Sequence, residues 1–353
     1  MMNILEKDIQ ELTSWKSCFE LFENTSVLIT GATGLLGSIL AKSLIAYAQR
    51  NNADIKVYAC CRSKEKYKRI FGGCQCSSLK PVFGDVSQLD ISSLCIDWIV
   101  HGASITDSRT FIERPVETIE TAVGGTQNLL RQCVGKELKG FVYLSSLEVY
   151  GAFKDFDGIK NVLESDGGYI DTMSVRASYS EGKRMAETLC ASYAAEYGIP
   201  VKVARLCQTF GAGVEYGDSR VFAQFARAVI EKSDIVLRTK GETVRNYCYT
   251  TDAVRGILTV LSKGRAGEAY NIANSDATVS IADMASRVCA LFLESGSHVV
   301  FDIAEDAGKL GYNPVVKMRL DSAKIEALGW KAEVSLDEMF RRLVEWMREI
   351  QKK

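Results

Sequence analysis

Three side chains in the sequence have the types and the spacing to take a proton from a hydroxyl group: Tyr179, Lys183 and Ser146. Tyr179 and Lys183 are four residues apart in a segment of helical pattern, so both should lie on one face of a helix. A free phenol has a pKa of about 10, and a neighbouring ammonium group favours its ionised form. Ser146 can hydrogen-bond the reacting oxygen and hold it near the phenol. Together they predict a base that removes a hydroxyl proton while hydride leaves the same carbon.

A Tyr-x-x-x-Lys pair also occurs by chance, as a half-buried tyrosine beside a solvated lysine. The glycine-rich segment 30–37, which reads TGATGLLG, argues against that alternative. It joins an apolar strand to a helix, where glycines let the backbone approach a pyrophosphate and the helix N-terminus offers free N–H groups. The alternative for the segment is a plain tight turn. We expect a dinucleotide to bind here through Gly31, Thr33, Gly34, Leu35, Leu36 and Gly37.

Alternating strands and helices should position these residues. The apolar pattern predicts strands at 27–30, 55–60, 81–85, 98–101, 140–145 and 201–205, and helices at 35–49, 116–134 and 179–197. Strands that are apolar throughout are typical of a parallel sheet covered on both faces, and right-handed crossovers make such a sheet doubly wound. The predicted fold class is therefore α/β, a Rossmann-type doubly wound parallel sheet with a smaller mixed α/β C-terminal substrate domain.

Two further regions flank this sheet. Residues 3–23 have apolar side chains at helical spacing and predict one amphipathic helix on the outside of the domain, with a partner-binding helix as the alternative. Beyond 206, helices are expected at 220–231, 281–293 and 335–350. We divide the chain into an N-terminal helix (1–24), a dinucleotide-binding domain (25–205, with a return segment near 240–262) and a substrate-binding domain (206–353). The last should cap the C-terminal edge of the sheet, where ligands of such sheets bind.

Composition excludes several other functions. The 353 residues are 47% hydrophobic and 25% charged, which predicts an ordered globular protein, and a net charge of −1 gives no sign of a nucleic-acid binder. The 11 cysteines lack the paired spacing of a zinc site, and no secretion signal precedes them. We therefore expect reduced thiols, no metal and a cytoplasmic location. No apolar run reaches the roughly 20 residues of a membrane span.

The spacing Gly-x-x-Gly-x-x-Gly after a threonine resembles the short-chain dehydrogenase/reductase superfamily, whose members bind NAD or NADP. In that comparison Lys183 holds the nicotinamide ribose, and Asp85 and Val86 contact the adenine; a turn or cap role is the alternative for Asp85. The superfamily's acidic residue at the end of the second strand is replaced by Arg62, which can contact a 2′-phosphate or stack on the adenine. Both cofactors therefore stay open. The same likeness places Gly102, Ala103 and Ser104 at the cofactor.

Motifs beyond this core resemble the extended branch of the superfamily, the nucleotide-sugar epimerases, dehydratases and decarboxylases, over about 27–346. The motifs are SSLEVYG at 145–151, RNYCYTTDAV at 245–254 and AYNIA at 269–273. By that likeness Arg245 and Arg319 contact the substrate's diphosphate, which the planar guanidinium suits, with a surface ion pair as the alternative. Gln208 stands where the branch has asparagine and would do the same work. The likeness also implies a homodimer, formed by the helices that follow the fourth and fifth strands.

A few positions bear on the type of reaction. The 4,6-dehydratases carry Thr-Asp-Glu where this chain has Ser146, Leu147 and Glu148, and Leu147 cannot protonate a departing hydroxyl. Glu148 remains as a candidate base or polar anchor. The segment 176–184 reads RASYSEGKR and resembles the UDP-glucuronate decarboxylases, as does DSRVF at 218–222, so Arg220 could pair with a substrate carboxylate. HGASIT at 101–106 departs from the His-Leu-Ala-Ser-Pro of those enzymes.

These observations predict an NAD(P)-dependent enzyme that oxidises a hydroxyl of a nucleotide-activated sugar, at C4, to a keto intermediate. The enzyme would then act as an epimerase or a decarboxylase. Two alternatives belong to other classes. An NADP-dependent sugar or carbonyl reductase is suggested by Arg62 and would show net turnover of cofactor. A non-catalytic dinucleotide-binding sensor is the other, although such proteins tend to lose the Tyr/Lys pair that this chain keeps.

Overall fold

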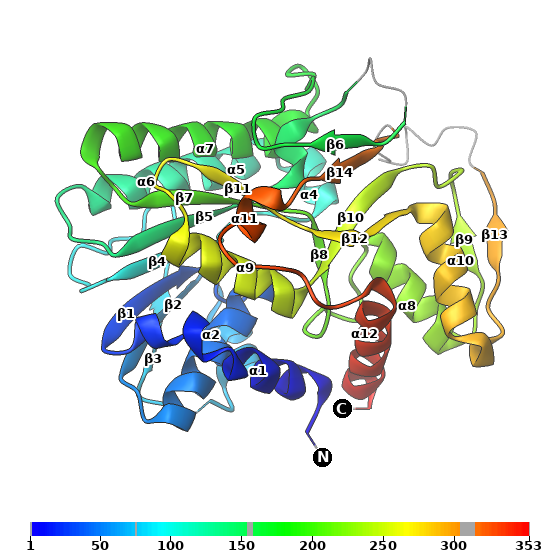
Figure 1. Cartoon of the computed structure of the whole chain (residues 1–353), viewed down its shortest axis with the longest axis horizontal. Helices are drawn as coiled ribbons and strands as arrows, with labels where there is room; N and C mark the ends of the chain where they lie inside the picture. Colours follow the sequence, from blue (N-terminus) through cyan, green and yellow to red (C-terminus); the bar gives the residue numbers. More distant parts are fainter. Residues whose placement is uncertain (1, 75, 154–157, 304–314, 353) are drawn as a thin grey trace.

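The computed structural model describes residues 2–74, 76–153, 158–303 and 315–352. At its centre lies a sheet of seven strands in the order β11-β7-β5-β4-β1-β2-β3, all paired in parallel (Figure 1). The chain leaves β1 towards β2 and β3 and then crosses to β4, so the switch point lies between β1 and β4. This confirms the predicted Rossmann-type α/β fold. The strands are β1 (Thr25–Thr30), β2 (Ile55–Cys61), β3 (Leu79–Phe83), β4 (Trp98–His101), β5 (Gly140–Ser146), β7 (Val201–Leu206) and β11 (Ala269–Ile272).

Both faces of the central sheet are buried, which explains why its strands are apolar without alternation. Val27 and Ile29 of β1 belong to one core cluster, together with α2 (Leu35–Asn51) and α9 (Thr250–Lys263). Leu28, between them, belongs to a second cluster on the opposite face, with residues of α6 (Gly125–Cys133) and α7 (Ala177–Tyr197). Figure 1 shows α6 and α7 on one side of the sheet and α2 and α9 on the other.

The connections between strands differ in detail from the sequence pattern. The helix predicted over 116–134 is divided into α5 (Pro115–Ile119), a π-helical turn (Glu120–Gly124) and α6. β3 ends at Phe83, two residues before the end of the predicted strand. The remaining short helices of this half are α3 (Lys64–Phe71), which follows β2, and α4 (Ser108–Glu113), which follows β4.

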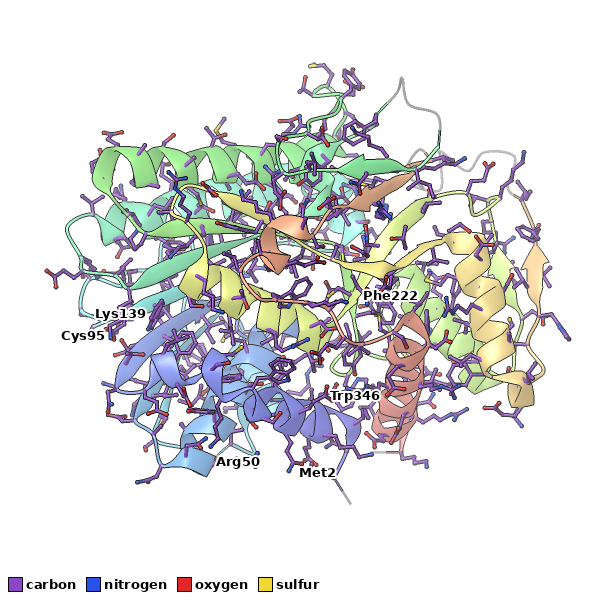
Figure 2. The ribbon with its side chains drawn as sticks, viewed as in Figure 1. Met2, Arg50, Cys95, Lys139, Phe222 and Trp346 are labelled. Atoms are coloured by element: carbon purple, nitrogen blue, oxygen red, sulfur yellow. The ribbon has the colours of Figure 1, made fainter. Side chains whose placement is uncertain are left out.

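The C-terminal part has its own core at one end of the central sheet. It contains a three-stranded sheet of β12 (Asn274–Ser280), β10 (Val244–Tyr249) and β8 (Gln208–Phe210), and two pairs, β9 (Ile235–Leu237) with β13 (Val299–Phe301) and β6 (Lys160–Val162) with β14 (Met318–Leu320). Phe222, labelled in Figure 2, stacks on Phe210 in this core. The helices around it are α8 (Val221–Glu231), α10 (Ile281–Leu291) and α12 (Leu336–Gln351), while α11 (Ala323–Glu326) packs on β11. The chain returns to the central sheet through α9 and β11.

The N-terminal helix is shorter than the pattern of 3–23 predicts. α1 (Ile4–Ser14) ends where the Ser14 hydroxyl donates to the Glu11 carbonyl at 2.6 Å, and two 3₁₀ turns follow, Lys16–Cys18 and Glu20–Phe22. Serine hydroxyls that bond to nearby backbone compete with continued helix. The turns bring Phe19 onto α2 and Phe22 onto β4, where both rings are fully buried. Burial of these rings therefore overrides the helical periodicity beyond residue 14.

A buried ion pair ties α1 to α12. One Asp8 carboxylate oxygen accepts from Arg342 Nη1 at 2.9 Å, and the other accepts from the Tyr249 hydroxyl at 2.6 Å. Burial raises the pKa of Asp8 to about 6, against the opposing effects of these two partners. Figure 1 shows α1 and α12 close together near the two ends of the chain. The pair therefore joins the first helix to the C-terminal part.

Arg342→Met is expected to lower the free energy of unfolding by about 3 kcal/mol, because the buried Asp8 carboxylate loses its partner. Urea denaturation measures this loss, and Asp8→Asn in the Arg342→Met background should recover part of it. The control is Lys7→Met, which removes an exposed pair between the same helices, Lys7 Nζ to Glu345 at 3.3 Å. That change should cost less than about 1 kcal/mol. Equal losses in Arg342→Met and Lys7→Met would contradict the role given to the buried pair.

Candidate active site

A cavity of about 1330 Å³ lies at the carboxyl ends of the parallel strands. Its walls come from the segments after β1 to β5, from the start of α7, from the loop 213–218 and from Trp346 of α12, which is labelled in Figure 2. The structure therefore brings together most of the residues singled out in the sequence. Those lining the cavity are Gly31, Thr33, Gly34, Leu35, Leu36, Gly37, Arg62, Asp85, Val86, Gly102, Ala103, Ser104, Ser146, Glu148, Tyr179, Lys183, Gln208 and Arg220.

The glycine turn is packed too closely for any larger side chain. Gly31 has φ of +69°, and a Cβ built on it would lie 2.7 Å from the Gly102 carbonyl oxygen. A Cβ on Gly37 would lie 2.4 Å from the Gly31 carbonyl oxygen. Gly34 is the N-cap of α2 and no side chain caps this helix, so its first N–H groups remain available to a ligand. This cradle fits the pyrophosphate of a dinucleotide.

Arg62 lines the cavity and lies between two carboxylates. Its Nη1 is 3.1 Å from a Glu117 oxygen and 3.9 Å from an Asp85 oxygen, and all three side chains are partly exposed. Hydrogen bonds from Ser87, with a smaller contribution from Arg62, lower the pKa of Asp85, so this carboxylate is ionised at neutral pH. This part of the cavity therefore has acidic as well as basic groups.

Tyr179 lies in the first turn of α7 and is almost completely buried, with 8% of its surface exposed. Burial, with a smaller contribution from the Glu148 carboxylate, raises its pKa to about 12. The Ser146 hydroxyl acts in the opposite direction, as do the charges of Arg176 and Arg220. The chain alone therefore holds the phenol protonated, and the phenolate expected from the sequence requires additional positive charge at the site.

Lys183 lies one turn after Tyr179 and is buried behind it. Its ammonium donates to the Leu144 carbonyl at 2.7 Å and lies 4.6 Å from the Tyr143 ring centre and 5.8 Å from the Tyr179 ring centre. Burial lowers its pKa to about 8. His101, which is fully buried in the same region, has its pKa lowered to about 3 by burial, so it is neutral. Lys183 is therefore the cation positioned behind the phenol.

Of the five predicted substrate residues, Ser146 lines the cavity, and the other four divide into two groups. Gln208 and Arg220 line the cavity, and Arg220 is paired with Asp218 at 2.6 Å. Arg245 and Arg319 lie outside the cavity lining, on β10 and β14, which pack against each other. Arg245 Nε is buried without a hydrogen-bond partner among the described residues, whereas the exposed Arg319 donates to Asn161 at 3.1 Å. Contact of these two arginines with a diphosphate stays a prediction.

Two residues that the sequence did not single out lie beside Tyr179 and Glu148. Phe111 stacks on the Tyr179 ring with centroids 4.3 Å apart, and Arg176 pairs with Glu148 at 3.0 Å. Arg176 stands in the segment RASYSEGKR, which was the available signal for it. Phe111 lies 68 residues before Tyr179 in a polar segment, and no local pattern indicated that the two rings meet.

Residues 2–74, 76–153, 158–303 and 315–352 contain no cluster of three metal-ligating side chains. The same residues contain no helix whose length and apolar character would let it cross a bilayer.

Comparison with known proteins places the chain among enzymes of nucleotide sugars. Residues 27–273 match the model of the NAD dependent epimerase/dehydratase family. The UDP-N-acetyl-alpha-D-glucosaminuronate decarboxylase of Bacillus cytotoxicus is 29% identical over 92% of this chain and 98% of its own. Human dTDP-D-glucose 4,6-dehydratase is 28% identical over 92% of this chain and 90% of its own. A Bacillus cereus UDP-glucuronic acid 4-epimerase, solved with UDP-glucuronic acid and NAD, has the same fold, with a TM-score of 0.75, 22% identity and coverage of 92% and 99%.

Proposed function

This chain belongs to the NAD-dependent epimerase/dehydratase family, and from that premise we propose that it oxidises the C4 hydroxyl of a nucleotide-activated sugar acid and releases the carboxyl group as carbon dioxide. Membership confirms the predictions of an enzyme and of a nicotinamide dinucleotide cofactor. It also removes the alternative of a non-catalytic sensor. The release of carbon dioxide, the substrate and the roles of individual residues are our proposals.

The observation that supports decarboxylation is the absence of an acid at Leu147. This side chain is apolar and buried between Ser146 and Glu148, and Glu148 is held as an ion pair by Arg176. Loss of water from a sugar requires an acid that protonates the departing hydroxyl. Loss of carbon dioxide from an acid with a neighbouring keto group requires none, since the electron pair of the broken bond moves into the carbonyl. Similarity of the chain to two decarboxylases also supports the proposal.

The first step follows from the positions of three side chains. A bound nicotinamide dinucleotide would accept hydride from C4 and return it at the end of the cycle. Tyr179 takes the proton of the C4 hydroxyl, and Ser146 holds the reacting oxygen close to the phenol. Lys183, buried behind Tyr179, supplies positive charge and holds the nicotinamide ribose. The carboxylate of the resulting 4-keto acid then leaves, C5 takes a proton from water, and Tyr179 returns its proton as C4 is reduced.

The sugar acid should be held by the polar groups at the other end of the cavity. Arg220 is our candidate for the carboxylate, because it lines the cavity and only Asp218 pairs with it among the described residues. Gln208 lines the same region and would hydrogen-bond the substrate. Arg245 and Arg319 would reach the diphosphate from the seam between β10 and β14.

We propose NAD rather than NADP as the cofactor. Arg62 was the argument for a 2′-phosphate, but its guanidinium is already paired with Glu117 and lies near Asp85. A 2′-phosphate would bring a dianion beside these two carboxylates, which is electrostatically unfavourable. The ribose hydroxyls of NAD bring no such charge. Parallel titrations with NAD and NADP would contradict the proposal if NADP bound more tightly.

We propose a homodimer formed through α4, α5 and α7. Apolar side chains on these helices are exposed, among them Ile112, Val116, Ile119 and Met185 at 48%, 64%, 43% and 51%. Exposed apolar patches of this kind are typical of interfaces. Val116→Glu with Met185→Glu should convert the protein to a monomer in sedimentation velocity. Met173→Glu is the control, because Met173 is 90% exposed and lies outside these helices. A wild-type monomer would contradict the proposal.

We propose that the enzyme works in the cytoplasm. All eleven cysteines are free in the structure, including adjacent buried thiols at Cys60 and Cys61. Unpaired thiols in this number suit a reducing compartment. Fractionation of the producing cells tests this, and recovery of the protein outside the cytoplasm would contradict it.

The decisive experiment measures the fate of the carboxyl carbon. The purified chain is incubated with UDP-glucuronate or UDP-N-acetylglucosaminuronate, each labelled with ¹³C at the carboxyl group, with NAD and NADP supplied separately. We expect labelled carbon dioxide and a product that lacks the carboxyl carbon. A product of unchanged mass would instead indicate an epimerase, and loss of water would overturn the argument from Leu147. Net accumulation of oxidised or reduced cofactor would favour the reductase alternative.

A further inference from the structure

Arg176 contacts both groups that flank the catalytic phenol. It precedes α7 directly and lies three residues before Tyr179, so the two side chains share one side of the helix. Its Nη2 donates to both oxygens of Glu148, at 3.1 and 3.0 Å. Its guanidinium carbon also lies 4.7 Å from the centre of the Phe111 ring. One side chain therefore joins a carboxylate and an aromatic ring beside the reacting group.

Phe111 supports the phenol through a close parallel contact. Its ring is inclined by 13° to that of Tyr179, with centroids 4.3 Å apart, and only 2% of Phe111 is exposed. Together with Ile105 the two rings form a small apolar cluster separate from the main cores. The Ser178 hydroxyl donates to the Phe111 carbonyl at 3.1 Å and ties α4 to α7. Movement of Phe111 would therefore move the Tyr179 ring.

The charge of Glu148 makes the Arg176 pair relevant to proton transfer. Glu148 lies in the 3₁₀ turn Leu147–Tyr150 that follows β5, where its negative charge opposes ionisation of Tyr179. Its Oε2 also accepts from the Ser180 hydroxyl at 3.3 Å. Arg176 and Arg220 act in the opposite direction on the phenol. The other charged or titratable groups that face Tyr179 are Lys183 of α7 and Tyr143 of β5.

We propose that Arg176 is a positioning residue for Tyr179, which pairs the negative charge of Glu148 and holds Phe111 against the phenol ring. The proposal rests on the proposed role of Tyr179 as the base. It does not depend on whether the keto sugar then loses carbon dioxide, since every outcome begins with the same proton transfer. Removal of Arg176 leaves Glu148 unpaired near the phenol, so ionisation of Tyr179 becomes less favourable.

The test compares Arg176→Met with the wild-type enzyme across pH. Because the phenolate is the reactive form, the acid limb of kcat/KM should move to higher pH by about one pH unit in Arg176→Met, an about tenfold loss of rate at neutral pH. Glu148→Gln in the Arg176→Met background should return the acid limb towards its wild-type position. Arg176→Lys keeps a positive charge and should therefore move the acid limb less than Arg176→Met does. Arg109→Met is the control, because Arg109 on α4 forms an exposed pair with Glu113.

A second measurement needs no substrate and separates this proposal from the proposed reaction. Ultraviolet difference titration against a Tyr179→Phe background follows ionisation of the phenol itself, and Arg176→Met should move it to higher pH. Thermal melting of each variant identifies simple unfolding. If Arg176→Met alone unfolds, the acid limb and the phenol titration are measured in the double variant Arg176→Met with Glu148→Gln. If Arg176→Met is folded and neither its acid limb nor its phenol titration moves, the proposal is overturned. A moved titration in an enzyme that releases no carbon dioxide would contradict only the proposed reaction.

Discussion

Replacement of Tyr179 by phenylalanine is expected to lower turnover by about 10³-fold while cofactor affinity stays close to that of the wild type. In the proposed reaction the phenol takes the hydroxyl proton, whereas the pyrophosphate would be held by the glycine turn, a different part of the cavity lining. Steady-state kinetics measure the first quantity, and equilibrium titration with NAD measures the second. The rise of the wild-type rate with pH, which reports phenolate formation, should also be absent from the residual activity.

A tyrosine on the same helix provides the control for this substitution. Tyr193 lies in α7 away from the cavity lining, where its ring meets that of Tyr197. Tyr193→Phe should leave turnover within about twofold of the wild type, as expected for a surface change. Retention of most activity in Tyr179→Phe would show that another group takes the proton. Loss of cofactor affinity in parallel with turnover would show that the substitution disturbs the site as a whole.

The second large effect is expected from Gly31→Ala. The new Cβ would lie 2.7 Å from the Gly102 carbonyl oxygen. The atoms of Gly102 and Ala103 that it meets belong to the backbone, so they cannot rotate away as a side chain could. The backbone of Gly31 also has a positive φ that alanine adopts at a cost. We expect a loss of about 3 kcal/mol of stability and an at least roughly 100-fold loss of NAD affinity, because the turn and the segment after β4 must separate. Urea denaturation and NAD titration measure the two losses.

Gly135→Ala separates the effect of strain from the effect of crowding. Gly135 has a φ of +77°, similar to that of Gly31, but an added Cβ there has no atom within 4 Å. This change should cost about 1 kcal/mol from backbone strain alone and leave NAD affinity unchanged. If both alanine variants bound NAD like the wild type, the glycine turn would not be the pyrophosphate site.

Local patterns in the sequence predicted the sheet and the walls of the cavity well. Apolar strands without alternation require two covered faces, and the residues after such strands must meet at one edge, which is where Ser146, Asp85 and Gly31 are found. The pattern failed for residues 15–23, where burial of Phe19 and Phe22 decides the conformation. Periodicity describes a helix in isolation and carries no information about the surface that receives its side chains.

The environment of the Tyr179 phenol could not be predicted in the same way. Phe111 and Arg176 reach Tyr179 and Glu148 only because α4, the end of β5 and the start of α7 converge in three dimensions. The sign of the pKa change also depends on burial, which a sequence does not give. Lys183 favoured a phenolate in the sequence, yet burial of Tyr179 raises its pKa to about 12 in the folded chain.

The contact between Asp8 and Arg342 also has a consequence for biosynthesis. The two residues are 334 positions apart, so at about 5–20 residues per second a ribosome makes Arg342 roughly 20 s to 1 min after Asp8. During that interval the polar side of α1 lacks its partner, and the edge strand β11 arrives only late in synthesis. α9, which packs against both α1 and α2, is also made late. Apolar surface of α1 and α2 therefore stays exposed during much of translation, a period in which chaperones would have their main opportunity to bind.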